Sequence, residues 1–291
     1  MSRRLPALAS PLAWGILALA ALTGCSSGSG SDQEEPEALE YVALGDSFTA
    51  GPLIPPADPA GGCLRSGSNY PSLVAAARDD VELTDVSCSG AGTVHLTAPQ
   101  TIGADIHAPQ LDALDADTDL VTVSIGGNDD QIAGSLLGVC QQLAVADPTG
   151  APCATAEAAG GDPVSTRLAR LNTRLVDAFA AVRDRAPEAR VVVVGYPQIV
   201  PSEGGCADLP LGLGDRAWAY RLNQGLTLTV QDAAERAGFE YVDTWAASAG
   251  HDICSTDPWI NGRTTDEGAA MAYHPFRAYE QAVADLLLEL L

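Results

Sequence analysis

The sequence contains no lysine, and all 15 of its basic residues are arginines, set against 38 acidic residues. The formal net charge is therefore -23 at pH 7. A surface this acidic repels phosphate backbones, so nucleic acid is not expected as a partner. Anionic lipid headgroups would be repelled as well, so surface charge cannot be what holds this protein at a membrane.

Motifs for metal and nucleotide binding are also missing. No two cysteines stand at CxxC spacing, which argues against a zinc site, and we predict neither a metal nor another cofactor. No GxGxxG follows the first apolar run, and no GK[ST] occurs anywhere. Dinucleotide and P-loop nucleotide binding are therefore not expected.

The sequence lacks an apolar run that would cross a membrane comfortably. Its N-terminal apolar stretch, residues 12–22, follows Arg3 and Arg4 and runs into Leu22-Thr23-Gly24-Cys25, which is the layout of a bacterial export signal. The tetrapeptide resembles the lipobox of bacterial lipoproteins, which implies cleavage before Cys25 and its lipidation. A plain secretory signal cut nearby is the alternative, and it would leave Cys25 as an ordinary thiol.

Three segments are predicted along the chain. Residues 1–24 form the signal peptide, and residues 25–40, rich in Gly and Ser and then acidic, form a flexible tether. Residues 41–291 are long enough for one large domain. We expect a monomer outside the cytoplasm, anchored to the cell membrane through a lipid on Cys25, or secreted.

Six cysteines remain once Cys25 is set apart. An even number of cysteines in an oxidising exterior predicts disulfides, although the sequence cannot choose among the possible connectivities. Sequential pairing closes the smallest loops. We therefore predict the pairs Cys63–Cys88, Cys140–Cys153 and Cys206–Cys254.

Short apolar runs alternate with helical patterns along the domain. The runs lie at residues 41–45, 81–86, 120–125, 190–194 and 239–242. Helices are expected at 69–79, 109–114, 163–185, 216–237 and 276–291. An excursion with few periodic apolar residues, stapled by its own disulfide, is expected at 134–162. This alternation predicts an α/β fold, a three-layer α/β/α sandwich with a five-stranded parallel sheet.

The first apolar run ends in Gly45-Asp46-Ser47, and a second glycine follows at Gly51. A turn of this kind places Ser47 at the carboxyl end of the sheet, where open α/β proteins bind ligands. Ser47 is therefore a candidate nucleophile. The alternative is that it only caps the following helix.

Two later strand ends carry small or polar residues. The second run leads into Ser87-Cys88-Ser89-Gly90 and the third into Gly126-Gly127-Asn128-Asp129, while His274 stands just before the last helix. An ester hydrolase needs a nucleophilic hydroxyl, an imidazole that accepts its proton, and donors aimed at the oxyanion. The order of these blocks at successive strand ends is more specific than any one of them.

These four blocks resemble those of the SGNH (GDSL) hydrolase family, and the resemblance spans residues 41–291. The six cysteines resemble the branch of secreted actinobacterial lipases and esterases that carries three disulfides. The resemblance implies the flavodoxin-like SGNH-hydrolase sandwich, with Ser47 as nucleophile and His274 as general base. It also implies an oxyanion hole made by Gly90, Asn128 and the Ser47 backbone N–H.

The sequence departs from the family pattern at the group that orients the histidine. Many members carry Asp three residues before it, and Met271 stands there in this chain. We predict that the Met271 main-chain carbonyl accepts a hydrogen bond from the His274 Nδ1–H, with Asp266 as the alternative. His251 is the second candidate for the base.

The predicted function is that of an extracytoplasmic lipase or esterase, which cleaves acyl esters of lipids or small alcohols through an acyl-Ser47 intermediate. The same residues serve carbohydrate O-deacetylases and acyltransferases. A non-catalytic binding lipoprotein on this fold is the alternative from a different class. The acyl chain length and the natural substrate stay open.

Overall fold

A computed structural model describes residues 38–291 of the chain. The predicted signal peptide, the predicted lipidation site Cys25 and most of the predicted tether lie outside the described residues. From residue 38 onward, no helix is long and apolar enough to cross a membrane.

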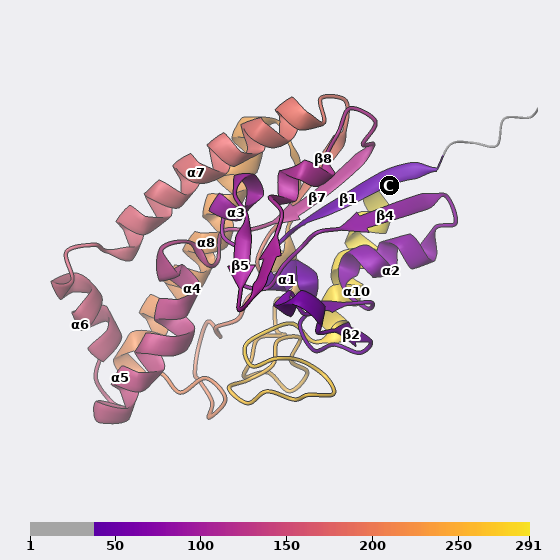
Figure 1. Ribbon diagram of the computed structural model, residues 1–291. Coiled ribbons are helices and arrows are strands. Elements are labelled where there is room, and N and C mark those ends of the chain that lie inside the picture. Colours follow the sequence, from indigo (N-terminus) through magenta and orange to yellow (C-terminus); the bar gives the residue numbers. More distant parts are fainter. Residues whose placement is uncertain (1–37) are drawn as a thin grey trace, which may run out of the picture. The chain divides into compact units, whose positions relative to one another are not determined.

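A five-stranded parallel sheet forms the centre of the described region (Figure 1). Its strands are β1 (Leu39–Gly45), β4 (Val81–Asp85), β7 (Leu120–Ser124), β8 (Arg190–Val194) and β9 (Glu240–Val242), in the spatial order β4-β1-β7-β8-β9. Ala43 in β1 aligns with Asp85 on one side and with Thr122 on the other. The predicted sheet is confirmed, and its strand order is the flavodoxin-like one.

Both faces of the central strands β7 and β8 are covered. All residues of β7 and the four valines of β8 are buried. A strand with one face in water would expose every second residue, and neither β7 nor the four valines of β8 do so.

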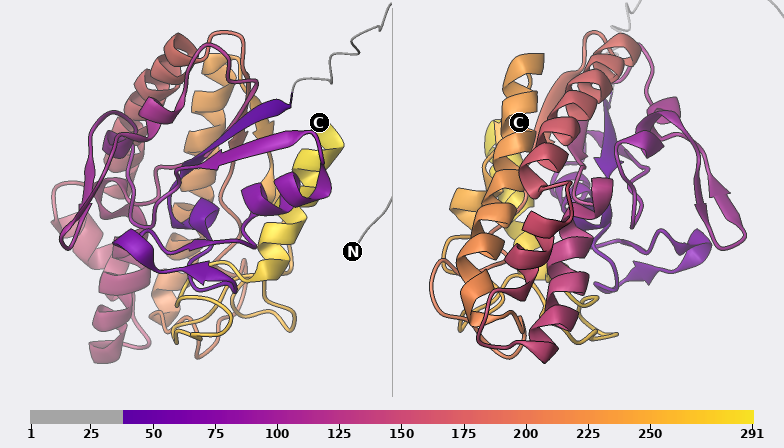
Figure 2. Two further views of the ribbon diagram at one scale, coloured as in Figure 1. Left: turned by 45° about the vertical axis from the view of Figure 1, so that its right-hand side comes forward. Right: turned by 90° about the vertical axis from the view of Figure 1, so that its left-hand side faces the viewer.

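Four helices make the outer layers (Figures 1 and 2). They are α2 (Tyr70–Ala77), α7 (Val164–Arg185), α8 (Arg216–Ala237) and α10 (Arg277–Leu290). α7 packs against α8, and α2 packs against α10. The chain moves one way from β1 to β4 and the other way from β7 to β9, so right-handed crossovers place these two pairs on opposite faces. The predicted three-layer sandwich is confirmed.

The predicted tether extends too far into the chain. Leu39 and Glu40 already belong to β1, where Leu39 aligns with Val81 and its N–H donates to the Asp80 carbonyl over 2.7 Å. No sign of this start is visible in the sequence because Leu39 is only half-buried and Glu40 is exposed, so the two residues do not extend the buried apolar run.

The stretch 134–162 carries its own disulfide, Cys140–Cys153, as predicted, and it is largely helical, which was not expected from the sequence. It contains the end of α4 (Ile132–Gly134), a π-helical turn (Ser135–Val139), α5 (Cys140–Ala146) and α6 (Pro152–Ala159). These helices are short, and few of their residues are buried, so the sequence shows no apolar stripe.

The remaining elements are short and lie in the connections. The helical ones are α1 (Ser47–Ala50), α3 (Val94–Thr97), α9 (Thr244–Ala247) and 3-10 turns at Ala60–Gly62, Gln110–Ala113, Asp129–Gln131 and Leu213–Asp215. Two small hairpins pair β2 (Ala57–Asp58) with β3 (Arg65–Ser66), and β5 (Gln100–Ile102) with β6 (Asp105–His107).

The structure joins the six cysteines of the domain in sequence order, as Cys63–Cys88, Cys140–Cys153 and Cys206–Cys254. The second bridge ties α5 to α6. The first holds the loop after β1 against the end of β4, so it supports the segment that contains Gly90.

Candidate active site

The candidate residues lie at the point where the strand order of the sheet reverses. From β1 the chain crosses to β4 on one side, whereas from β7 it crosses to β8 on the other. The carboxyl ends of β1 and β7 therefore flank the switch point at which open α/β sheets bind ligands. Ser47 follows β1, and Asn128 follows β7.

Ser47 is the first residue of α1, and Asp46 is the residue that caps this helix. The Asp46 Oδ1 atom accepts a hydrogen bond from the Phe48 N–H over 2.9 Å. The alternative that Ser47 serves only as the cap is therefore wrong, and its hydroxyl is not used in capping. Gly45 permits the tight turn, because a Cβ atom there would lie 2.1 Å from the Thr49 Oγ1 atom.

Gly90 lies in a tight turn just after β4. The Ala91 N–H donates to the Cys88 carbonyl over 3.0 Å, and Gly90 has a φ of 79°, a backbone conformation that favours glycine. A Cβ atom on Gly90 would meet only Gln100, at 3.7 Å. The conformation of the turn, rather than crowding, therefore explains the glycine.

Asn128 is anchored to the same loop. Its Nδ2 atom donates to the Ala91 carbonyl over 2.9 Å. An amide nitrogen carries two hydrogens, so this bond fixes the side chain and leaves a second N–H. The loops after β4 and β7 are joined by this contact.

A backbone carbonyl orients His274, as predicted, but the residue is Ala272 and not Met271. The His274 Nδ1 atom lies 2.7 Å from the Ala272 carbonyl oxygen. The Met271 carbonyl instead accepts from the His274 backbone N–H over 3.2 Å, which closes a turn, and also from the Asn261 side chain over 3.2 Å. The turn therefore uses the Met271 carbonyl, and the imidazole bonds to the carbonyl of Ala272, two residues before His274.

The bond to Ala272 decides the tautomer of the imidazole. A carbonyl oxygen can only accept, so the Nδ1 atom carries the proton and the Nε2 atom is left as the acceptor. Burial lowers the pKa of His274, and the hydrogen bond to Ala272 opposes this shift. The lowered pKa favours the neutral, proton-accepting form of His274 at neutral pH.

The structure brings His274 beside α1. The Phe48 ring, next in sequence to Ser47, lies 5.9 Å from the imidazole between centroids. The Met271 N–H donates to the Pro52 carbonyl over 3.1 Å, which ties the histidine loop to the segment after α1. No hydrogen bond within residues 38–291 joins the Ser47 hydroxyl to His274; such bonds often tighten only when substrate binds.

Comparisons with known proteins identify the family of this chain. The sequence model of the "GDSL-like Lipase/Acylhydrolase family" matches residues 43–280. The chain belongs to this family. It is 37% identical to "Lipase 2" of Streptomyces coelicolor, over 97% of this chain and 95% of that protein. It is 32% identical to "Lipase" of Streptomyces rimosus, over 82% of this chain and 81% of that protein.

Solved structures of similar proteins have the same fold. Phospholipase A1 from Streptomyces albidoflavus NA297 superimposes with a TM-score of 0.70 at 31% identity, covering 87% of this chain and 99% of that one. The extracellular lipase from Streptomyces rimosus gives a TM-score of 0.70 at 30% identity, with the same coverage. The chain is thus a carboxylic ester hydrolase of the lipase or esterase type.

The other histidines of this GDSL hydrolase have partners elsewhere. The His251 Nδ1 atom lies 2.8 Å from the Asp257 carbonyl, and its ring stacks on Trp259 at 4.1 Å. The His95 Nδ1 atom accepts from the Gly92 N–H over 2.9 Å. The His107 Nε2 atom lies 2.6 Å from the Gly61 carbonyl.

The alternative orienting group, Asp266, does not contact His274 within the described part of the chain. Its side chain is exposed and accepts from the Gly268 N–H over 2.9 Å, which closes a local turn. The imidazole is therefore held by the Ala272 carbonyl and not by a carboxylate.

A buried hydroxyl at this site was missed by sequence reasoning. Tyr196 follows β8, and its Oη atom donates to Asp46 Oδ2 over 2.5 Å and accepts from the Gly127 N–H over 2.9 Å. The available signal was its position, since it stands just past a strand end, as Ser47 and Asn128 do.

Burial governs the charge of Asp46. Asp46 is 1% exposed, and its pKa is raised to about 7. Burial is the largest cause and Asp129 adds to it, while the hydrogen bonds from Tyr196 and from the Phe48 N–H oppose the shift. Asp129 accepts from the Thr93 N–H and hydroxyl and pairs with Arg174 at 3.1 Å, so it supports the loop beside Asn128.

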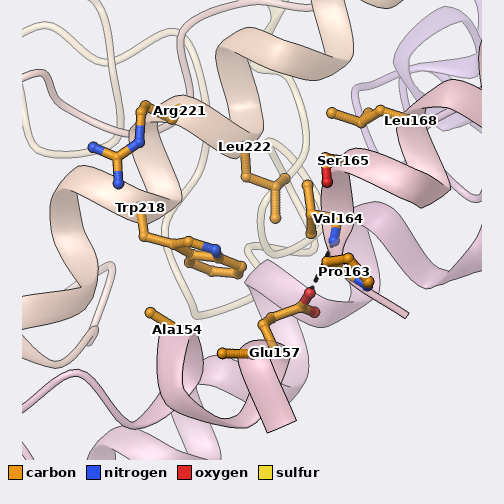
Figure 3. Close-up of a pocket in the computed structure, with 10 residues that line it drawn as sticks. Ala154, Glu157, Pro163, Val164, Ser165, Leu168, Trp218, Arg221 and Leu222 are labelled. Carbon is orange, nitrogen blue, oxygen red and sulfur yellow. Dashed lines mark hydrogen bonds between the residues drawn. The ribbon is translucent and has the colours of Figure 1, made fainter. Parts of the chain in front are cut away.

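Two hollows differ in their relation to the site. A groove of about 610 Å³ begins at Gly90 and Asn128 and runs between α3 and α7, where Arg174 lines it. A cleft of about 430 Å³ lies between α6, α7 and α8, with Trp218 among its walls (Figure 3). No candidate catalytic residue lines the second cleft.

One group of side chains has the spacing of metal ligands. Atoms of Cys63, Cys88 and His107 lie within 4.8 Å of one another. The two sulfurs are joined in a disulfide, so neither is a thiolate, the form in which cysteine binds metals. This group does not fit a metal while the bridge is closed.

Proposed function

We propose that this protein is an extracytoplasmic serine hydrolase that cleaves lipid acyl esters through an acyl-Ser47 intermediate. The observation that carries the proposal is the hydrogen bond between the His274 Nδ1 atom and the Ala272 carbonyl, because it leaves the Nε2 atom as the proton acceptor. The imidazole lies beside Phe48 of α1. Ser47, in the first turn of α1, supplies the hydroxyl.

The reaction would proceed in two halves. His274 takes the Ser47 hydroxyl proton as the oxygen attacks the ester carbonyl carbon, and it returns that proton to the departing alkoxide. The acyl group then remains on Ser47. Water, deprotonated by the same imidazole, attacks this ester, and the proton goes back to Ser47 as the acid leaves.

Three donors would stabilise the oxyanion of each tetrahedral intermediate. They are the backbone N–H groups of Ser47 and Gly90 and the second N–H of Asn128. Within residues 38–291 neither backbone N–H has an acceptor, and the bond to Ala91 holds the amide in place. One such donor contributes roughly 3–4 kcal/mol to transition-state stabilisation.

The similar proteins favour a lipid ester as substrate, because two lipases and a phospholipase A1 match most of this chain at 31–37% identity, whereas an esterase of Streptomyces scabiei matches at 28%. Three disulfides support a site of action outside the cytoplasm. We further propose that residues 1–24 are removed, that a lipid on Cys25 anchors the protein, and that residues 39–291 act as a monomeric catalytic domain.

The test is a p-nitrophenyl ester series from acetate to palmitate with wild type and Ser47→Ala, together with labelling by a serine-directed phosphonate. We expect wild type to cleave long-chain esters, and Ser47→Ala to lose activity and labelling together. Activity on acetylated sugars alone would replace this proposal with an O-deacetylase. Absence of labelling in folded wild type would favour a non-catalytic binding lipoprotein.

A further inference from the structure

Tyr196 connects the loops that carry the nucleophile and the oxyanion amide. Asp46 immediately precedes Ser47, and Gly127 immediately precedes Asn128. The Tyr196 Oη atom bonds to both preceding residues, donating to Asp46 Oδ2 over 2.5 Å and accepting from the Gly127 N–H over 2.9 Å. One oxygen atom therefore joins the ends of β1, β7 and β8.

The direction of these two bonds is fixed. A backbone N–H can only donate, so the hydroxyl accepts from Gly127 and sends its own hydrogen to the carboxylate. The other carboxylate oxygen of Asp46 accepts from Phe48. Removing the hydroxyl would leave the Gly127 N–H and one Asp46 oxygen without these partners in a dry interior, where an unmade hydrogen bond is costly.

The tyrosine itself is held firmly. It is 1% exposed, and its ring packs edge-on against Phe48 at 5.4 Å. Its backbone N–H donates to the buried Thr227 hydroxyl of α8 over 3.1 Å. Gly127 leaves room for the hydroxyl, because a Cβ atom there would lie only 3.3 Å from the Tyr196 Oη atom, a tight contact.

We propose that Tyr196 is a positioning residue for catalysis, whose hydroxyl sets the distance between the Ser47 nucleophile and the Asn128 oxyanion donor. This inference rests on the proposed roles of Ser47 and Asn128. Its physical basis is that the reaction needs both groups aligned on one carbonyl, and that small displacements of such groups cost about 100-fold in rate.

The first experiment compares Tyr196→Phe with Tyr41→Phe. Tyr41 is also 1% exposed, and its hydroxyl shares a 2.8 Å hydrogen bond with Thr122 between β1 and β7, away from the loops. We expect Tyr196→Phe to lower kcat roughly 10- to 100-fold with KM within about twofold. Tyr41→Phe should keep kcat within about twofold while losing comparable thermal stability.

The second experiment asks whether Tyr196 acts through Asp46. An Asn at position 46 has one accepting oxygen for two donors, so Asp46→Asn breaks the connection from the other side. The loss in kcat for the double variant should then be close to that of Asp46→Asn alone. Independent losses that multiply in the double variant would overturn this connection.

The pH dependence of kcat/KM distinguishes a positioning role from a merely structural one, because a purely structural role of Tyr196 would leave it unchanged. The titratable groups that act on Asp46 are Tyr196 and Asp129, and the Tyr196 hydroxyl stabilises the ionised carboxylate. Without that hydroxyl, the acidic limb of kcat/KM should move to higher pH. An unmoved limb, or equal kcat in the two Phe variants, would overturn the inference.

The inference and the proposed function fail in distinguishable ways. If Ser47→Ala retains the wild-type activity, the proposed chemistry is wrong and the inference falls with it. If Ser47→Ala is inactive and Tyr196→Phe matches Tyr41→Phe in kcat and pH profile, the serine mechanism stands and Tyr196 has no positioning role.

Discussion

The imidazole of His274 depends on a single neutral hydrogen bond. In the absence of a carboxylate at its Nδ1 atom, the Ala272 carbonyl sets the tautomer, and burial keeps the ring neutral. A backbone carbonyl cannot be removed by changing the side chain of its residue. We therefore expect the orientation of the imidazole to be insensitive to substitution at nearby acidic positions, and a pair of variants tests this.

His274→Ala should abolish ester hydrolysis, whereas Asp266→Ala should retain most of it. Loss of a general base typically costs about 100- to 10,000-fold, while Asp266 only closes an exposed turn with Gly268. The measurement is kcat/KM on a soluble p-nitrophenyl ester. Comparable losses in the two variants would mean that Asp266 orients the imidazole after all.

Asp46→Asn should expose the titration of His274. With ionised Asp46 needed for the Tyr196 connection, the acidic limb of the wild type should reflect a carboxyl with a pKa of about 7. The amide cannot titrate, so the limb that remains in the variant belongs to His274, whose pKa is lowered by burial. It should lie below pH 6.5, and a limb that stays near 7 would contradict this assignment.

Among the elements, α10 is fastened to α2 through a buried carboxyl. The Glu280 Oε2 atom accepts from the Tyr70 N–H, at the start of α2, over 2.8 Å. The Oε1 atom has no partner among the described residues, and the side chain is fully buried. Burial raises the pKa of Glu280 well above its usual value, and Asp85 raises it further.

Glu280→Gln should flatten the dependence of stability on pH. Because the folded state holds the proton more tightly than the unfolded state, the wild type loses stability as pH rises above the unfolded value of about 4.3. Thermal unfolding at pH 5 and pH 8 measures this, with the exposed Glu289→Gln in the same helix as control. A wild-type slope in Glu280→Gln would show that Glu280 ionises when folded.

The molecule as a whole combines a strongly acidic chain with three covalent bridges. Repulsion among like charges, at a net charge of -23, destabilises the folded state. Disulfides oppose this effect because they lower the entropy of the unfolded chain. The bridges differ in the loops that they close, from 13 residues for Cys140–Cys153 to 48 for Cys206–Cys254. The longer loop removes more unfolded-state entropy.

Replacing both cysteines of a bridge by serine should therefore cost more at Cys206–Cys254 than at Cys140–Cys153. We expect losses of about 4 and about 3 kcal/mol in the free energy of unfolding. Urea unfolding under oxidising conditions measures the free energy of unfolding of both variants. The wild type with its disulfides reduced serves as the reference. The reverse order would show that native contacts, rather than loop length, decide the contribution.

Much of the fold was predictable because its signals are local. The buried strand β8 and the apolar stripe of α7 can each be recognised from residues close together in the sequence. The alternation of such strands and helices along the chain allows few topologies. The helices between 132 and 159 were not predictable, since they bury too little to show a period. The start of β1 was missed because Leu39 is only half-buried and Glu40 is exposed, so they do not continue the apolar run.

By itself, the sequence determined the parallel sheet, the strand ends that carry Ser47, Gly90 and Asn128, and the presence of His274 near the C-terminus, because each depends on residues close together in the chain. Only the tertiary structure decided which carbonyl holds the imidazole and that Tyr196 joins Asp46 to Gly127. These contacts depend on where a turn points a carbonyl and on residues 150 and 69 positions apart, and no local pattern encodes such distances.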